Sequence, residues 1–115
     1  MRPGARTPEE LETLFEDALI VGDAGALVGL FEDGAVLDAG GELQQARGNQ
    51  EIARVATAMW GGDRTYLADL RRVVQVREIA LSVGHGINVL RRGTDGAWRY
   101  VISLLDLDNG QQQGR

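Results

Sequence analysis

Residues 7–23, TPEELETLFEDALIVGD, contain the beginning and end of one helix and the beginning of a second. The segment Thr7–Glu10 is a capping box with proline at the first helical position, which is typical of a helix start. Apolar residues then recur on one face of that helix, at Leu11, Leu14, Phe15 and Ala18. Gly22 is expected to end the helix, and Asp23 can cap the next one. The sequence therefore predicts two consecutive helices.

Short elements are expected to follow these helices. Asp33-Gly34 predicts a turn, residues 35–39 a strand, Gly40-Gly41 a reversal, and residues 42–47 a returning strand. Asn49 can then cap a third helix. Its apolar face is formed by Ile52, Val55, Ala56 and Met59.

The remainder of the chain is expected to be β-structure. Long strands are predicted over residues 66–77, 79–92 and 97–107, with turns at residues 77–78 and 94–96. Helices that lie on one side of an antiparallel sheet make an α+β domain. We therefore expect three N-terminal helices packed on a curved, mostly antiparallel sheet, with a cavity enclosed between the two layers.

Length and composition limit the classes of protein that the chain can represent. Its 115 residues predict a single domain over 1–115, with flexible tails at 1–6 and 108–115. The chain has no cysteine, which excludes a disulfide framework and a thiolate metal site. Its net charge of −5 argues against nucleic acid as a partner. Because neither a signal peptide nor a membrane-spanning run is present, we expect a cytoplasmic protein with no membrane partner.

Four segments resemble a known family when they are taken in order: Leu14–Asp23, Leu30–Leu37, Gly48–Ile52 and Asp95–Val101. They resemble the SnoaL-like and ketosteroid isomerase-like proteins of the nuclear transport factor 2-like superfamily. The resemblance implies a cystatin-like α+β cone, a pocket inside the cone, and frequent dimers. It does not fix the function, since the superfamily includes isomerases, polyketide cyclases, epoxide hydrolases, dehydratases and proteins that only bind ligands.

The chain departs from the ketosteroid isomerase pattern at two of three catalytic positions. The family's oxyanion-binding tyrosine corresponds to Phe15, and its later acid falls near Ile87. Only Asp38 lies close to a family catalytic position. Steroid-type isomerisation is therefore not expected.

Two residues are the candidates for proton transfer. Asp38 shares parity with Val36, so it is predicted to point into the cone, where burial would favour its role as a base. His85 is the single histidine, and the odd positions of its strand are apolar, which predicts that it faces the cavity. The alternative for Asp38 is a turn residue next to Gly40-Gly41. The alternatives for His85 are a buried structural histidine and a rim residue flanked by Gly84 and Gly86.

The predicted ligand pocket combines aromatic, apolar and hydroxyl side chains, with a small hydrophobic molecule as ligand. The expected ligand-binding residues are Phe15, Trp60, Tyr66, Ile87, Val101 and Ser103. No cofactor is expected. No metal is expected either, because one histidine without a regular carboxylate spacing does not form a metal site.

Two functions remain open at this point. One is a cofactor-independent acid–base enzyme, and the other is a non-catalytic dimeric module of the same fold. The last strand favours a dimer because both of its faces are apolar. One face is expected to carry Trp98, Tyr100, Ile102 and Leu104, and the other Val101, Ser103, Leu105 and Leu107. We expect a homodimer that covers the face of the sheet opposite the helices.

Overall fold

The computed structural model describes residues 4–38, 45–60, 72–84 and 86–105. Three helices and six strands lie within these residues. In chain order they are α1 (Pro8–Val21), α2 (Ala24–Val28), β1 (Phe31–Asp38), β2 (Gln45–Arg47), α3 (Asn49–Trp60), β3 (Arg72–Val76), β4 (Ile79–Val83), β5 (Gly86–Arg92) and β6 (Trp98–Leu105).

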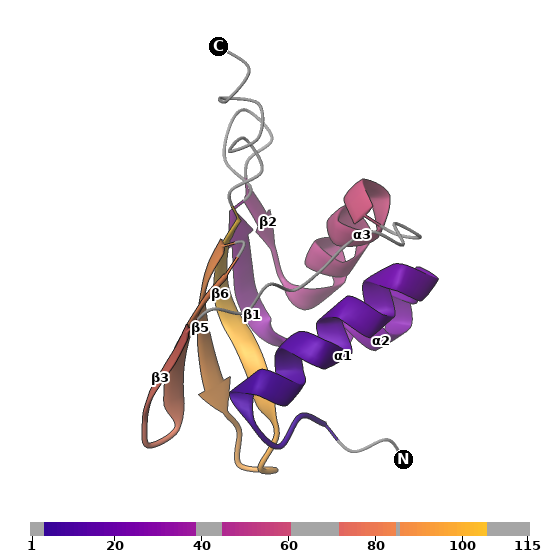
Figure 1. Cartoon of the computed structure of the whole chain (residues 1–115). Coiled ribbons are helices and arrows are strands. Elements are labelled where there is room, and N and C mark those ends of the chain that lie inside the picture. The colour runs from indigo at the N-terminus through magenta and orange to yellow at the C-terminus, as the bar shows by residue number, and fades with distance from the viewer. Residues whose placement is uncertain (1–3, 39–44, 61–71, 85, 106–115) are drawn as a thin grey trace.

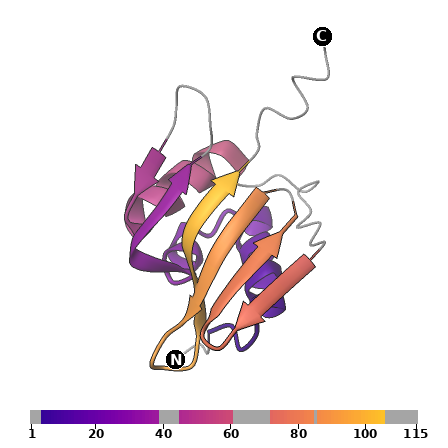
Figure 2. The same cartoon turned by 90° about the vertical axis from the view of Figure 1, so that its left-hand side faces the viewer.

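The strands form one sheet in the order β2-β1-β6-β5-β4-β3. Only β1 and β6 pair in parallel, and the other neighbours are antiparallel. All three helices lie on the same side of this sheet (Figure 1), and Figure 2 shows the opposite side with no helix of the described chain over it. The predicted α+β architecture with a mostly antiparallel sheet is confirmed. We call the helix-covered side the inner face and the other side the outer face.

The helix ends follow the local sequence. The Thr7 hydroxyl oxygen accepts a hydrogen bond from the Glu10 amide at 3.0 Å, and Gly22 closes α1 in the left-handed region at a φ of 70°. The Asp23 carboxylate accepts one from the Ala26 amide at 3.0 Å. These contacts satisfy amide groups that have no partner inside a helix, so the predicted starts of α1 and α2 are confirmed.

The expectation of one long strand over residues 79–92 is wrong. This segment forms two strands, β4 and β5, that pair antiparallel with Val83 opposite Ile87. The Gly84 amide donates to the Gly86 carbonyl at 2.9 Å, which closes the turn between them. The sheet gains a hairpin as a result.

The first strand also begins earlier than expected, at Phe31. Asp33-Gly34 is not a turn but part of β1, at the place where its register with β6 shifts between Phe31 and Val36. This register shift allows the exposed residues Asp33 and Gly34 to remain within the strand. The predicted reversal at Gly40-Gly41 lies outside the described residues.

Side chains on the inner face form two rows that cross the sheet. The first row is formed by Ala80, Leu90, Tyr100 and Phe31, which are successive register partners. The second row is formed by Ser82, Asn88, Ser103 and Leu37. All eight side chains are buried, so this face and the helices enclose the core.

A β-bulge in β6 changes which side chains reach this core. Leu90 pairs with Tyr100 and Val89 pairs with Ile102, so Val101 is an extra residue without a partner on β5. The alternation of faces reverses there. Ile102, like Leu104, therefore points to the outer face. The expected division of this strand into two faces is wrong for this reason.

The N-terminal segment is attached to the sheet. Ala5 is buried and forms an isolated antiparallel bridge with Trp98, whose amide donates to the Ala5 carbonyl at 2.9 Å. The expected flexible tail over residues 1–6 is wrong for residues 4–6. Residues 108–115 lie outside the described part. Of the helices that the structure describes, none has the length and apolar character needed to cross a membrane.

Candidate functional site

A group of buried polar side chains lies on the inner face, beneath α1. It consists of Glu12 from α1, Ser82 from β4, Asn88 from β5 and Ser103 from β6, and we call it the polar cluster. The exposed fractions of these four residues range from 0% to 8%. The cluster brings together three neighbouring strands and a helix that is 70 residues away in the chain.

Hydrogen bonds connect the carboxylate to the sheet. The Ser82 hydroxyl donates to Glu12 Oε2 at 2.9 Å, and the Asn88 side-chain amide donates to the same oxygen at 3.5 Å. Asn88 also donates to the Ser82 hydroxyl oxygen at 3.2 Å. Ser103 is the register partner of Asn88, so its side chain lies on the same face in the next strand.

Burying a carboxylate at this place does not by itself stabilise the fold. Removing a charged group from water costs several kcal/mol even after the surroundings relax. Apolar residues of similar volume would pack the same space at no such cost. The polar cluster is therefore the strongest candidate for a functional site among the described residues.

Aromatic rings pack beside the polar cluster, along the first inner row. The rings of Phe15, Phe31 and Tyr100 lie with their centres 5.0 to 6.0 Å apart. Phe15 comes from α1, one turn after Glu12, so the same helix face supplies an aromatic ring and a carboxylate. The inner face thus combines an apolar region with a confined polar one.

The structure separates the predicted ligand-binding residues. Phe15 and Ser103 are both buried on the inner face. Val101 is the bulge residue and is half-buried. Ile87 lies on the outer face with 45% of its surface exposed, so the expectation that it faces the cavity is wrong. Trp60 is the last residue of α3, and its side chain, like Tyr66 and His85, lies outside the described part.

Asp38 also lies on the outer face. It is the register partner of Leu104 on β6 and of Gln45 on β2. The Gln45 side-chain amide donates a hydrogen bond to the Asp38 carboxylate at 3.2 Å. The neighbouring Leu37 is the residue that points into the core. The expected inward orientation of Asp38 is therefore wrong, and its pairing with His85 stays a prediction.

The members of the polar cluster differ in how far the sequence could have revealed them. Glu12 precedes Phe15 by three residues and Leu19 by seven, which puts it at the edge of the apolar helix face. That spacing was a usable signal. For Ser82 and Asn88 there was none, because the alternate positions of their strands are apolar and suggested the opposite orientation.

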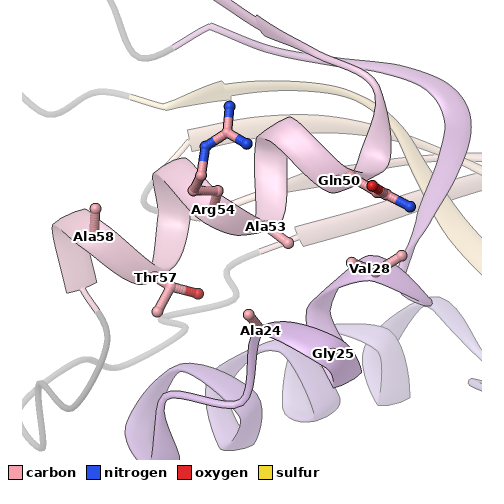
Figure 3. A pocket seen from close by; sticks show the side chains of 8 residues that line it. All are labelled: Ala24, Gly25, Val28, Gln50, Ala53, Arg54, Thr57 and Ala58. Atoms are coloured by element: carbon pink, nitrogen blue, oxygen red, sulfur yellow. The ribbon is translucent and has the colours of Figure 1, made fainter.

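Two of the surface grooves among the described residues lie away from the polar cluster. One, of about 480 Å³, lies between α2 and α3 and is lined mainly by small side chains (Figure 3). The Thr57 hydroxyl oxygen there is buried and has no hydrogen-bond partner among the described residues. Because this oxygen is inaccessible to solvent, it offers no polar contact to a ligand in the groove.

The other groove, of about 1050 Å³, lies between α1, α2 and the turn that precedes β6. Three of its charged side chains, Asp23, Asp95 and Arg99, have structural partners. Asp23 caps α2, and Asp95 forms an ion pair with Arg99 at 2.7 Å. Neither groove gathers a set of three or more histidine or carboxylate groups that could hold a metal ion, and the rest of the described chain does not either.

Ion pairs stabilise one end of the sheet. Hydrogen bonds from the Arg99 side chain, with a further one from the Ala97 amide, lower the pKa of Asp95 from its ordinary value of 3.8 to about 2. Hydrogen bonding to Arg91 lowers the pKa of Glu32, and this pair joins β5 to β1 at 2.7 Å. Both carboxylates therefore stay ionised at neutral pH.

The outer face carries a band of exposed apolar side chains. It includes Val74, Val76, Ile79, Leu81, Ile87, Ile102 and Leu104, with exposed fractions from 39% to 67%. Register pairing places members of all four strands β3 to β6 next to one another. We call these seven residues the outer apolar patch. Soluble monomers rarely expose a large contiguous surface of this kind.

Solved structures are similar to this fold over most of the chain. A ketosteroid isomerase-like protein from Erwinia carotovora atroseptica is 20% identical, with a TM-score of 0.69 over 85% of this chain and 91% of that one. A protein with a cystatin-like fold from Nostoc punctiforme is 17% identical, with a TM-score of 0.67 over 88% of both chains. The chain has the nuclear transport factor 2-like fold.

An NTF2-like protein from Pseudomonas putida is similar at a lower level, with 12% identity and a TM-score of 0.64 over 85% of this chain and 82% of that one. No protein-family model and no curated protein matches the sequence. These identities are low, so the likeness establishes the NTF2-like fold and leaves the chemistry to be argued from the site.

Proposed function

We propose that this NTF2-like protein binds a small, mainly hydrophobic molecule between α1 and the inner face of the sheet. The observation that carries the proposal is the burial of Glu12 against Ser82 and Asn88, where a purely structural core would be apolar. Ligand sites are largely apolar with a few convergent polar groups, and the aromatic rings beside the polar cluster match that composition.

The proposal extends to catalysis without a cofactor. Glu12 is a carboxylate in an environment with little water, where it can accept a proton from a bound molecule and return it. Ser82 and Asn88 donate hydrogen bonds to one of its oxygens and so hold the carboxylate in position. Isomerisation, cyclisation, hydrolysis and dehydration all need such proton transfer. In this proposal Glu12 takes the role for which Asp38 was the candidate.

Titration of the isotope-labelled protein with cyclohexanol, followed by NMR, tests the proposed site. This probe has an apolar ring of modest size and one hydroxyl group. We expect saturable shifts at the backbone amides of Ser82, Asn88 and Ser103. Shifts confined to the outer apolar patch, or to the groove between α2 and α3, would contradict the proposal.

A second proposed function is self-association through the outer apolar patch. The seven exposed apolar side chains support it, because a two-fold contact would bring the same patch of two copies together. Trp98 and Tyr100, which were expected in this interface, are buried in the core and do not contribute. Ligand binding on the inner face and pairing on the outer face are compatible, since they use opposite sides of the sheet.

A further inference from the structure

The strand β3 has less support from the rest of the chain than its neighbours in the sheet. It lies at one edge of the described sheet and pairs there with β4 (Figure 2). Four of its five residues are exposed, and the fifth, Val73, packs against the core. A two-stranded hairpin is at best marginally stable without such packing, so β3 depends mainly on its hydrogen bonds to β4.

The turn between β3 and β4 adds a backbone cost. Arg77 and Glu78 form this two-residue turn, and Arg77 has a φ of 55°, which lies in the left-handed region. Residues with a Cβ atom rarely adopt this region, and two-residue hairpin turns favour glycine, asparagine or aspartate where φ is positive. The arginine at this position therefore weakens the closed hairpin.

Contacts near the turn hold β4 rather than β3. The Arg92 amide donates to the Glu78 carbonyl at 2.8 Å, and the Arg92 side chain forms an ion pair with the Glu78 carboxylate at 2.6 Å. On the β3 side, the Gln75 side-chain amide donates to the Arg77 carbonyl at 3.1 Å, which is a local contact. All of these contacts would survive if β3 separated from β4.

The outer side chains of this hairpin make up more than half of the outer apolar patch. Val74 pairs with Leu81 and Val76 with Ile79, and the four side chains are 39% to 67% exposed. Residues 106–115 contain one large apolar side chain, Leu107, so this stretch of sequence offers little apolar surface to cover them. A second copy of the chain carries the same apolar patch and can cover all four residues at once.

We infer that a second copy of the chain holds β3 on the sheet, so that association through the outer apolar patch and closure of the β3–β4 hairpin are coupled. This inference rests on the proposed self-association and names its effect on the fold. Burial of Val74 and Val76 by the partner copy offsets the backbone cost at Arg77. A monomer with an open hairpin lacks part of the patch, so the apparent affinity depends on the closed fraction.

Hydrogen exchange measured by mass spectrometry tests the coupling in the parent protein. Samples are labelled well above and well below the dissociation constant that sedimentation gives. In the dilute sample, we expect β3 to exchange within about tenfold of the rate of an unstructured chain, while β6 stays well protected. In the concentrated sample, exchange in β3 should be at least about tenfold slower than in the dilute one.

Two substitutions in the turn test whether the backbone cost at Arg77 contributes to this coupling. Arg77→Gly removes the cost of a positive φ, whereas Arg77→Ala, the matched control, removes the same charge and keeps that cost. We expect the glycine variant to dimerise at least about threefold more tightly than the alanine variant, because more of its monomers have a closed hairpin. Sedimentation velocity over a concentration series gives both dissociation constants.

The outcomes separate this inference from the proposed self-association. If the parent does not associate, the proposed dimer fails, and the inference fails with it. If the parent dimerises but β3 is as protected as β6 in the monomer, or equally unprotected in both states, the inference is overturned and the dimer stands. Equal dissociation constants for the two variants overturn it as well. The exchange measurement uses the parent alone, so it decides the matter even if a variant does not fold.

Discussion

Replacing Ile87 by arginine should dissociate the dimer that the outer apolar patch is proposed to form. Ile87 lies within this patch, and 45% of its surface is exposed in the single chain. Full burial of a large apolar side chain contributes about 1.5–3 kcal/mol, so covering the exposed half should contribute about 1 kcal/mol. With seven such residues on each copy, the gross gain is on the order of 10–15 kcal/mol, comparable to the cost of association.

The variant changes both copies in a two-fold dimer. It removes about 1 kcal/mol from each side and also places two guanidinium groups in an apolar contact. We therefore expect the dissociation constant to rise by at least about 100-fold, because every 1.4 kcal/mol corresponds to about tenfold. Sedimentation velocity over a concentration series measures this change directly.

Val21→Arg provides the matched control. Val21 is 73% exposed but lies at the end of α1, away from the outer face, so this variant adds the same charge without touching the patch. It should sediment like the parent. The reasoning is refuted if the parent sediments as a 12.4 kDa monomer at high micromolar concentration. It is also refuted if the two variants weaken association equally.

Three further predictions concern stability. Thr7→Ala removes the hydrogen bond to the Glu10 amide and should lower the free energy of unfolding by about 1 kcal/mol in urea titrations, whereas no loss would show that the cap is unimportant. Leu90→Ala empties a fully buried position of β5 and should cost about 2–5 kcal/mol in the same assay; a cost below that of Thr7→Ala would contradict the described core. Because folding lowers the pKa of Asp95 to about 2, its contribution is present above its ordinary pKa of 3.8 and is lost as the pH falls toward 2. The stability advantage of the parent over Asp95→Asn should therefore shrink over that range, and a constant difference would argue against the ion pair with Arg99.

Local signals predicted the helical part of the fold well. Thr7, Gly22 and Asp23 act within one turn of the chain, through hydrogen bonds and φ values that their own residue types determine. The predicted start of α3 at Asn49 also agrees with the structure. Such features depend little on distant contacts, so they can be inferred from the sequence alone.

The orientation of the strands could not be predicted in the same way. The outer face is nearly as apolar as the inner one, so alternation along β4 and β5 did not show which side the helices cover. Val101 adds a bulge that reverses the faces of β6. For these reasons Asp38 and Ile87 were expected inside, and the buried Ser82 and Asn88 were not recognised.

A crystal structure of the protein grown with cyclohexanol would show whether a ligand binds at the polar cluster. We expect the ring to lie between α1 and the inner face of the sheet, with its hydroxyl group within hydrogen-bonding distance of the Glu12 carboxylate. The contrary result is a polar cluster closed over by packed side chains, with the alcohol bound only at the outer apolar patch or in the groove between α2 and α3.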